Sequence, residues 1–242
     1  MDLVKRWKRK PSTQRKYLVT VTYEGLTALV IMHLIGGPFL TAYLLHLGAS
    51  SEQVGIVTSI PSLANIAQLF VALNMKRFSN RRVSLIVLAG VHRFIWVATG
   101  LIPIVFRDQP HLWVPVYVGM YLVSFILTSM ANVVFSSLVS DMVPARIRGK
   151  YFGIRNMILW GAAGVALLVG GQIMDMYPGA TGFYILYSIS AVFVLLNLYG
   201  LIRFPSLPMQ HSEEPNVYRQ FTKTLRDRPF IVAVVFISVF LL

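Results

Sequence analysis

Six long, mostly uncharged apolar runs constrain this chain more than any other feature of its sequence. They lie at about 18–46, 53–75, 83–106, 112–140, 151–174 and 180–202, and about 20 apolar residues suffice for a helix to cross a bilayer core. Only 13% of the 242 residues are charged, whereas soluble domains contain about 25%. The sequence therefore predicts an all-α fold, a polytopic transmembrane bundle with six complete spans.

A seventh apolar run begins near Phe230 and reaches Leu242. As a helix it would extend about 20 Å, short of a hydrocarbon core of about 30 Å. We therefore expect a fragment or a natural truncation that does not transport alone; otherwise the last segment is not a span. The expected organisation is a basic cytoplasmic amino terminus at 1–17, the bundle at 18–203, a cytoplasmic linker at 204–229 and the truncated start of a seventh span at 230–242.

The placement of the basic residues predicts the orientation of the bundle. A net charge of +13 would by itself suggest nucleic acid. However, 19 of the 22 Lys and Arg residues lie in the amino terminus and in the second, fourth and sixth loops, whereas the opposite loops contain only Arg107. By the positive-inside rule we expect a multi-pass protein of the cytoplasmic (inner) membrane, with a cytoplasmic amino terminus, the lipid bilayer as partner and no nucleic acid.

Three local patterns carry a resemblance to a known family. Asp-Met-Val-Pro at 141–144 precedes Arg-Gly-Lys-Tyr-Phe-Gly at 148–153, Leu-Gly-Ala-Ser at 47–50 precedes the second span, and four glycines lie within 161–171. These patterns resemble the loop after the fourth span, the first outer loop and the Gly-rich fifth span of the major facilitator superfamily (MFS). The resemblance implies the amino-terminal half of an MFS-type fold.

The same resemblance implies a function. It predicts a secondary active transporter that moves a small solute by alternating access between two six-span halves. A small-molecule substrate, with or without a coupling ion, and the missing carboxy-terminal half would be its partners. The family's signature loop between the second and third spans is degenerate here, because Leu73 and Asn80 stand at its glycine positions and Arg77 at its aspartate position. Nothing in the sequence identifies the substrate or the direction of transport.

A membrane-embedded enzyme and the transmembrane subunit of a nucleotide-driven exporter are the alternative functions. No serine lies in a Gly-x-Ser-x-Gly setting, as a nucleophile elbow would require. The five histidines are scattered and there is no cysteine, so neither a metal site nor a disulfide is expected. The sequence also lacks a phosphate-binding Gly-x-x-x-x-Gly-Lys-[Ser/Thr] loop. We expect neither enzymatic activity nor a cofactor.

Ionisable residues inside the predicted spans are the first candidates for a functional site, because they are costly in a membrane and usually face the bundle interior. They are Glu24 and His33 in the first span, His92 and Arg93 in the third and Arg155 in the fifth. From the cytoplasmic face, Glu24 lies about 9 Å and Arg155 about 6 Å into their helices. We therefore predict an ion pair between them. The alternative is that each reaches separately toward the headgroups.

Arg93 lies about 15 Å along its span, close to the midplane, and therefore needs a partner. We favour a buried structural role over contact with an anionic group of the substrate. Asn65 and Gln68 share one face of the second span, with Asn132 as their possible counterpart, and helix-to-helix hydrogen bonding is favoured over cavity lining. Gly-Gly-Pro at 36–38 is the best hinge candidate.

The cytoplasmic loops contain candidate gating residues. Asp141 ends a predicted helix and can pair with basic groups across loops. Pro144 starts a turn, and Gly149 would let the chain turn tightly into the next helix. The alternative is that these basic residues only set the topology. The full set is Arg81, Arg82, Asp141, Pro144, Arg148, Gly149 and Gly153.

Overall fold

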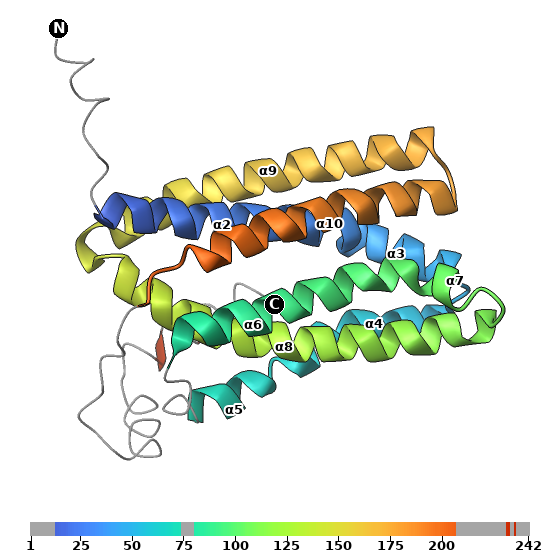
Figure 1. Cartoon of the computed structure of the whole chain (residues 1–242), viewed down its shortest axis with the longest axis horizontal. Coiled ribbons are helices and arrows are strands. Elements are labelled where there is room, and N and C mark those ends of the chain that lie inside the picture. The colour runs from blue at the N-terminus through green and yellow to red at the C-terminus, as the bar shows by residue number, and fades with distance from the viewer. Residues whose placement is uncertain (1–12, 74–79, 207–230, 233–234, 236–242) are drawn as a thin grey trace, which may run out of the picture. The chain divides into compact units, whose positions relative to one another are not determined.

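The structure, a computed structural model, describes residues 13–73, 80–206, 231–232 and 235, and in these ranges it contains helices and no strands (Figure 1). The chain divides into two units, Met1–Leu207 and Pro208–Leu242. The helices of the first unit are α2 (Thr13–Ile35), α3 (Gly37–His46), α4 (Ser51–Ala64), α5 (Ala67–Leu73), α6 (Arg81–Ala98), α7 (Ile102–Val105), α8 (Trp113–Met142), α9 (Arg148–Met176) and α10 (Ala180–Ile202). Most of the predicted seventh span and nearly all of the linker lie outside the described residues.

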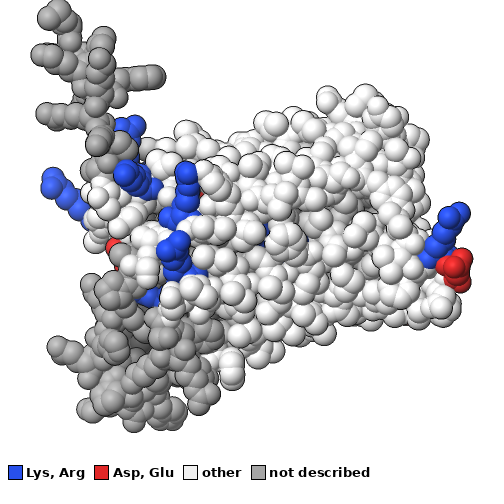
Figure 2. All heavy atoms as spheres, in the orientation of Figure 1, with Lys and Arg blue, Asp and Glu red and all other residues white. Residues whose placement is uncertain are grey.

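Six stretches of helix in the described residues are long and apolar enough to cross a membrane, which confirms the predicted class. They are Thr13–His46, Ser51–Ala72, Arg81–Val105, Pro110–Met142, Ala145–Met176 and Ala180–Ile202. Large apolar side chains such as Leu168 and Met157 are exposed along the bundle, as expected of a surface that faces lipid. Figure 2 shows uncharged atoms covering the length of the molecule, with most described Lys and Arg at the end where α2 begins.

The first and second spans are broken in the middle. The first changes from α2 to α3 at Gly36, where Gly37 adopts a φ of +52°, a region that favours glycine. Pro38 follows at the start of α3, where a missing N–H costs nothing. The second span changes from α4 to α5 shortly after Pro61. The hinge candidate at 36–38 is therefore a real break in the helix.

The main packing pairs reveal an internal repeat. α2 packs against α9 and α10, and α8 in the same way packs against α4 with α5 and against α6. α6 also packs against α10. Figure 1 shows the two groups, α2, α9 and α10 beside α4, α6 and α8. If the first, second and third spans are exchanged with the fourth, fifth and sixth, the same packing pairs result. The exchanged spans run in opposite directions, as in an inverted repeat of three helices.

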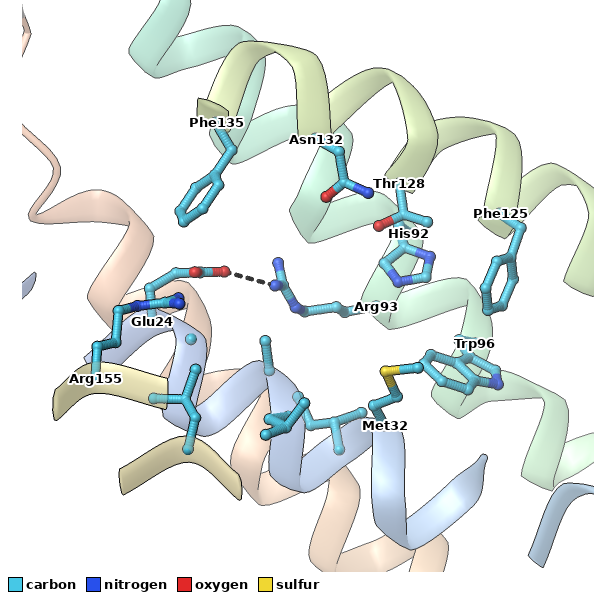
Figure 3. A pocket seen from close by; sticks show the side chains of 15 residues that line it. Glu24, Met32, His92, Arg93, Trp96, Phe125, Thr128, Asn132, Phe135 and Arg155 are labelled. Carbon is cyan, nitrogen blue, oxygen red and sulfur yellow. Dashed lines mark hydrogen bonds and ion pairs between the residues drawn. The ribbon is translucent and has the colours of Figure 1, made fainter. Parts of the chain in front are cut away.

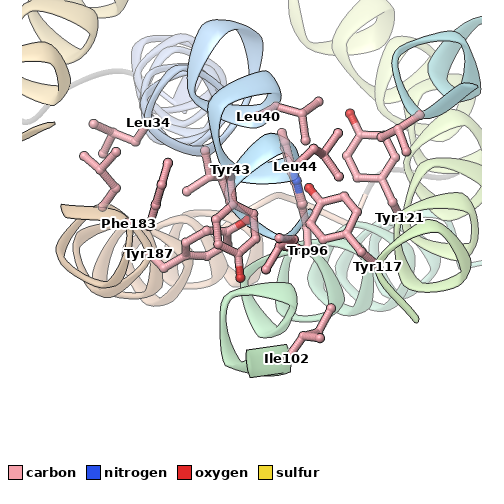
Figure 4. Packing of buried hydrophobic residues seen from close by; sticks show 14 of the residues in the cluster. Leu34, Leu40, Tyr43, Leu44, Trp96, Ile102, Tyr117, Tyr121, Phe183 and Tyr187 are labelled. Carbon is pink, nitrogen blue, oxygen red and sulfur yellow. The ribbon is translucent and has the colours of Figure 1, made fainter. Parts of the chain in front are cut away.

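Two apolar clusters fill the bundle, one toward each end, with a polar belt between them. The arginine-end cluster lies toward the start of α2 and includes Val21, Leu85, Ala131 and Leu201. The aromatic-end cluster includes Ile31, Tyr43, Trp96, Tyr117, Tyr121, Phe183, Tyr187 and Val194 (Figure 4). Buried polar residues separate the two clusters along four helices: Glu24 and Thr27 on α2, His92 and Arg93 on α6, Ser124 and Ser129 on α8, and Asn197 on α10.

Candidate functional site

A cavity of about 340 Å³ lies among α2, α6, α8 and α9 at the level of the polar belt (Figure 3). Its wall contains five of the eight intramembrane candidates that the sequence suggested: Glu24, His92, Arg93, Asn132 and Arg155. Aromatic and apolar side chains complete it, chiefly Met32, Trp96, Phe125 and Phe135. A mostly apolar cavity with a few convergent polar groups is the usual form of a small-molecule site.

Glu24 forms its ion pair with Arg93. Arg93 Nη2 donates to Glu24 Oε1 over 2.8 Å, and both residues are buried, with relative exposures of 9% and 6%. The predicted pair between Glu24 and Arg155 is wrong, because the structure contains no such ion pair among its described residues. The depth of two residues in the membrane does not identify an ion pair, because depth does not say which helices are neighbours or which way their side chains face. Arg93 does have the buried partner that its depth demanded.

Asn197 holds the backbone of α2 beside this ion pair. Its Nδ2 donates to the carbonyl of Glu24 over 3.0 Å and to Thr27 Oγ1 over 2.7 Å. These bonds fix α10 to α2 at the residue that carries the carboxylate. Sequence reasoning missed Asn197, although an amide inside an apolar span is a recognisable signal, because such side chains usually bond across helices.

Arg155 also lies at this cavity, but it forms no ion pair with the described residues. Its guanidinium packs against the backbone of Gly25, so closely that an added Cβ at position 25 would overlap Nη2. Its Nε is buried with no hydrogen-bond partner. Within the described part of the chain no side chain forms an ion pair with it. The charged side chains of the wall are therefore one carboxylate and two guanidinium groups.

His92 connects α6 to α8 at the edge of the cavity. Its Nδ1 lies 2.9 Å from the carbonyl of Ser124 and 2.7 Å from Ser124 Oγ, and that hydroxyl donates to the carbonyl of His92 over 3.1 Å. Since a carbonyl only accepts, Nδ1 carries a proton. The ring packs beside Trp96 and Phe125. His92 thus positions part of the aromatic wall.

The other intramembrane candidates lie outside the cavity. His33 Nδ1 is 2.8 Å from the carbonyl of Leu29, one turn back on its own helix. Asn65 Oδ1 accepts from Gln68 Nε2 over 2.9 Å and from Ser129 Oγ over 3.3 Å. The fourth span therefore supplies Ser129 as the counterpart of Asn65, in place of Asn132. Ser129 and Asn132 are about one helical turn apart, and the sequence alone could not show which of them faces Asn65.

The candidate gating residues tie helix ends together at the arginine end. Arg81 Nη2 donates to Asp141 over 2.8 Å and Arg81 Nη1 to Ser137 Oγ over 2.7 Å, so the sequence correctly brought Asp141 near the basic loop. Arg82 donates to the carbonyl of Ile202. Arg148 donates to the carbonyls of Ser140 and Val143, over 3.2 and 3.3 Å. Arginines are well suited to such terminal carbonyls.

The expected tight turn at Gly149 is not present. Gly149 and Gly153 lie inside α9, and neither has a positive φ. The chain turns earlier, at Val143 and Pro144, where extended backbone separates α8 from a short 3-10 turn at Ala145–Ile147. Proline stops the preceding helix because it disfavours helical geometry at the residue before it.

Comparison with known proteins agrees with this architecture. A family model described as Major Facilitator Superfamily matches residues 26–242. No curated protein and no solved structure matches the chain. The matched range begins within α2 and contains all of the later described helices. A six-span bundle built from an inverted repeat of three helices is the form of one half of a transporter in this family. The chain is thus a multi-pass membrane transporter protein that belongs to the Major Facilitator Superfamily.

Proposed function

We propose that the protein is a secondary active transporter that moves a small solute across the cytoplasmic membrane by alternating access. The observation that carries this proposal is the cavity among α2, α6, α8 and α9 at the level of the polar belt, between the two apolar clusters. Transporters with repeated helical units bind their substrates near the bilayer midplane, where the units meet. The cavity is then the part of the solute site that this bundle contributes.

A second six-span unit is the partner that this mechanism requires. Alternating access works when two units rock against each other around a fixed site. The break at 36–38 would let the end of the first span move without unwinding α2.

The amino terminus faces the cytoplasm in this proposal, because most described Lys and Arg gather at that end of the bundle (Figure 2). We assign Arg81, Arg82, Asp141 and Arg148 to the cytoplasmic gate. Their bonds join the ends of α6, α8, α9 and α10. Opening toward the cytoplasm would require at least some of them to separate.

Accessibility of the cavity from each face tests the mechanism. The chain has no cysteine, so single cysteines can be introduced without background labelling. Thr128→Cys lies in the wall of the cavity. In intact cells and in inside-out vesicles it should react with a membrane-impermeant thiol reagent from both faces. Reaction from one face alone would contradict alternating access.

Three matched positions calibrate this labelling. Gln109→Cys, in an exposed loop, should react only from outside, and Asn80→Cys, exposed before α6, only from inside. Val165→Cys, on the apolar exposed surface of α9, should react from neither face because lipid covers it. The reverse pattern at the two loop positions would invert the proposed orientation.

A further inference from the structure

The charges of the cavity do not balance. The Glu24 carboxylate forms an ion pair with Arg93, and Arg93 Nη1 also donates to the carbonyl of Ala89 over 3.4 Å. That pair is neutral as a whole. Arg155 forms no ion pair with a described side chain, so the wall of the cavity carries two positive charges and one negative charge (Figure 3). An uncompensated charge within a membrane bundle is costly, so something that the protein binds should offset it.

The position of the Arg155 guanidinium argues against an outward reach to the headgroups. Arg155 lies seven residues after the start of α9 at Arg148, about 10 Å into the helix. Its Nη2 packs against Gly25, the residue next to Glu24. Its side chain therefore stays in the cavity beside the ion pair, where Gly25 leaves room for it because glycine has no side chain.

The remainder of the wall suits an apolar body. Trp96, Phe125, Phe135 and Met32 line the cavity, and Figure 3 shows Trp96, Phe125 and Met32 grouped at the end opposite Arg155. The volume of about 340 Å³ is at the lower end of the range for small-molecule sites. The cavity thus has a cationic end and an aromatic end.

We propose that the transported solute is a small organic oxyanion, with its carboxylate or phosphate held by Arg155 and its apolar body held against the aromatic end. This rests on the proposed function, which makes the cavity the solute site. The planar guanidinium of arginine binds either oxyanion through two parallel hydrogen bonds. A cationic solute would meet the surplus positive charge, and a neutral one would leave it uncompensated.

Binding to the purified full chain tests this without requiring transport. Replacing Trp7, Trp113 and Trp160 by Phe leaves Trp96 as the only tryptophan, a fluorescent reporter inside the cavity. The probes are benzoate, phenyl phosphate, benzamide and benzylamine, titrated in phosphatidylcholine nanodiscs. At least one anion should bind saturably, and the neutral and cationic probes at least about tenfold more weakly, as expected when a hydrogen-bonded charge pair is lost.

The variant Arg155→Gln should weaken anion binding at least about tenfold. Arg203→Gln, which removes the same charge from an exposed arginine stacked on Tyr199 outside the cavity, should leave it unchanged. Thermal unfolding gives a second readout: removing an uncompensated cation should not lower the melting temperature, whereas removing a structural arginine should.

Three results in pure phosphatidylcholine nanodiscs would overturn the proposal. They are the absence of saturable binding by either anion, equal binding of benzamide or benzylamine, and unchanged anion affinity in Arg155→Gln. Competition by phosphatidylglycerol in the nanodiscs would assign the site to a lipid headgroup and equally overturn it. The two anions distinguish a carboxylate from a phosphate. Failure of the labelling experiment would affect alternating access and leave this binding result standing.

Discussion

Two arginine–carboxylate pairs of equal length lie in different surroundings. Arg81–Asp141 and Arg93–Glu24 both measure 2.8 Å. The Asp141 side chain is 28% exposed at a helix end, whereas that of Glu24 is only 8% exposed in the middle of the bundle. Near the first pair, the basic residues Arg146, Arg148 and Lys150 are exposed. Arg155, near the second pair, lines the cavity and is only partly exposed.

The difference shows that the geometry of an ion pair does not reveal its role. The Arg81–Asp141 pair joins α6 to α8 and is completed by Ser137. Beside the Arg93–Glu24 pair, Arg155 is a third charge that forms no ion pair in the described part of the chain. In the proposed function, the pair at the gate and the pair at the solute site therefore differ in the charge that remains after pairing and in its access to water.

The largest effect should come from Glu24→Gln. This change leaves Arg93 and Arg155 as two uncompensated cations in one cavity. Breaking a buried pair from one side costs about 3–5 kcal/mol, so the folded yield in detergent and the melting temperature should fall steeply. A Glu24→Gln variant as stable as the parent would remove the distinction between the two pairs.

Second-site changes identify the partner of Glu24. Arg93→Gln in the Glu24→Gln background should recover part of the lost stability, because it removes the charge that lost its partner. Arg155→Gln in the same background should recover less. Stability measured over both double-mutant cycles gives the coupling energies directly. A stronger coupling of Glu24 to Arg155 would restore the pairing that the sequence suggested.

A smaller effect is expected at the helix ends. Asp141→Asn should reduce the free energy of unfolding by about 1 kcal/mol, because the pair is partly exposed, and added salt, at about 0.5 M, should shrink that loss. The cost of Glu24→Gln should be insensitive to salt. Asp108→Asn, at an exposed carboxylate with no ion pair in the described chain, is the control. Equal salt dependence at Glu24 and Asp141 would contradict the comparison.

Much of the fold could be predicted from the sequence, because the limits of each span depend on residues that follow one another along the chain. Apolar runs gave six spans close to the observed limits of helices such as Arg81–Val105. The break at 36–38 followed from Gly and Pro chemistry. The nearness of Asp141 to the basic loop followed from both lying at one membrane face.

Lateral neighbours could not be predicted in this way. Glu24 bonds to Arg93 on α6 and Asn65 bonds to Ser129 on α8, and both outcomes depend on which helix faces which and at what rotation. Asn197 was missed for the same reason, since nothing local says that it meets Glu24 on α2. Counting charged residues in the spans did find all three charged groups of the cavity, because burying a charge is costly wherever its helix lies.

The smallest effect on stability, and the most specific test of the cavity, should come from Gly25→Ala. The new methyl group would overlap Nη2 of Arg155 and lie 3.0 Å from Leu159 Cδ2. Nη2 is the end of a flexible side chain, so it can move, and the melting temperature should change little. Gly164→Ala, on α9 with nothing near its Cβ, is the matched control and should be neutral or stabilising by up to about 1 kcal/mol.

The displaced guanidinium should no longer align with a bound oxyanion, so benzoate or phenyl phosphate affinity should fall several-fold in Gly25→Ala and stay unchanged in Gly164→Ala. If position 25 acts only through Arg155, then Gly25→Ala should cause no further loss in the Arg155→Gln background, because no guanidinium remains to be displaced. Additive losses in that double variant would mean that the methyl group blocks the cavity itself. In that case the room left by Gly25 would serve the solute, and the argument for Arg155 would rest on its charge alone.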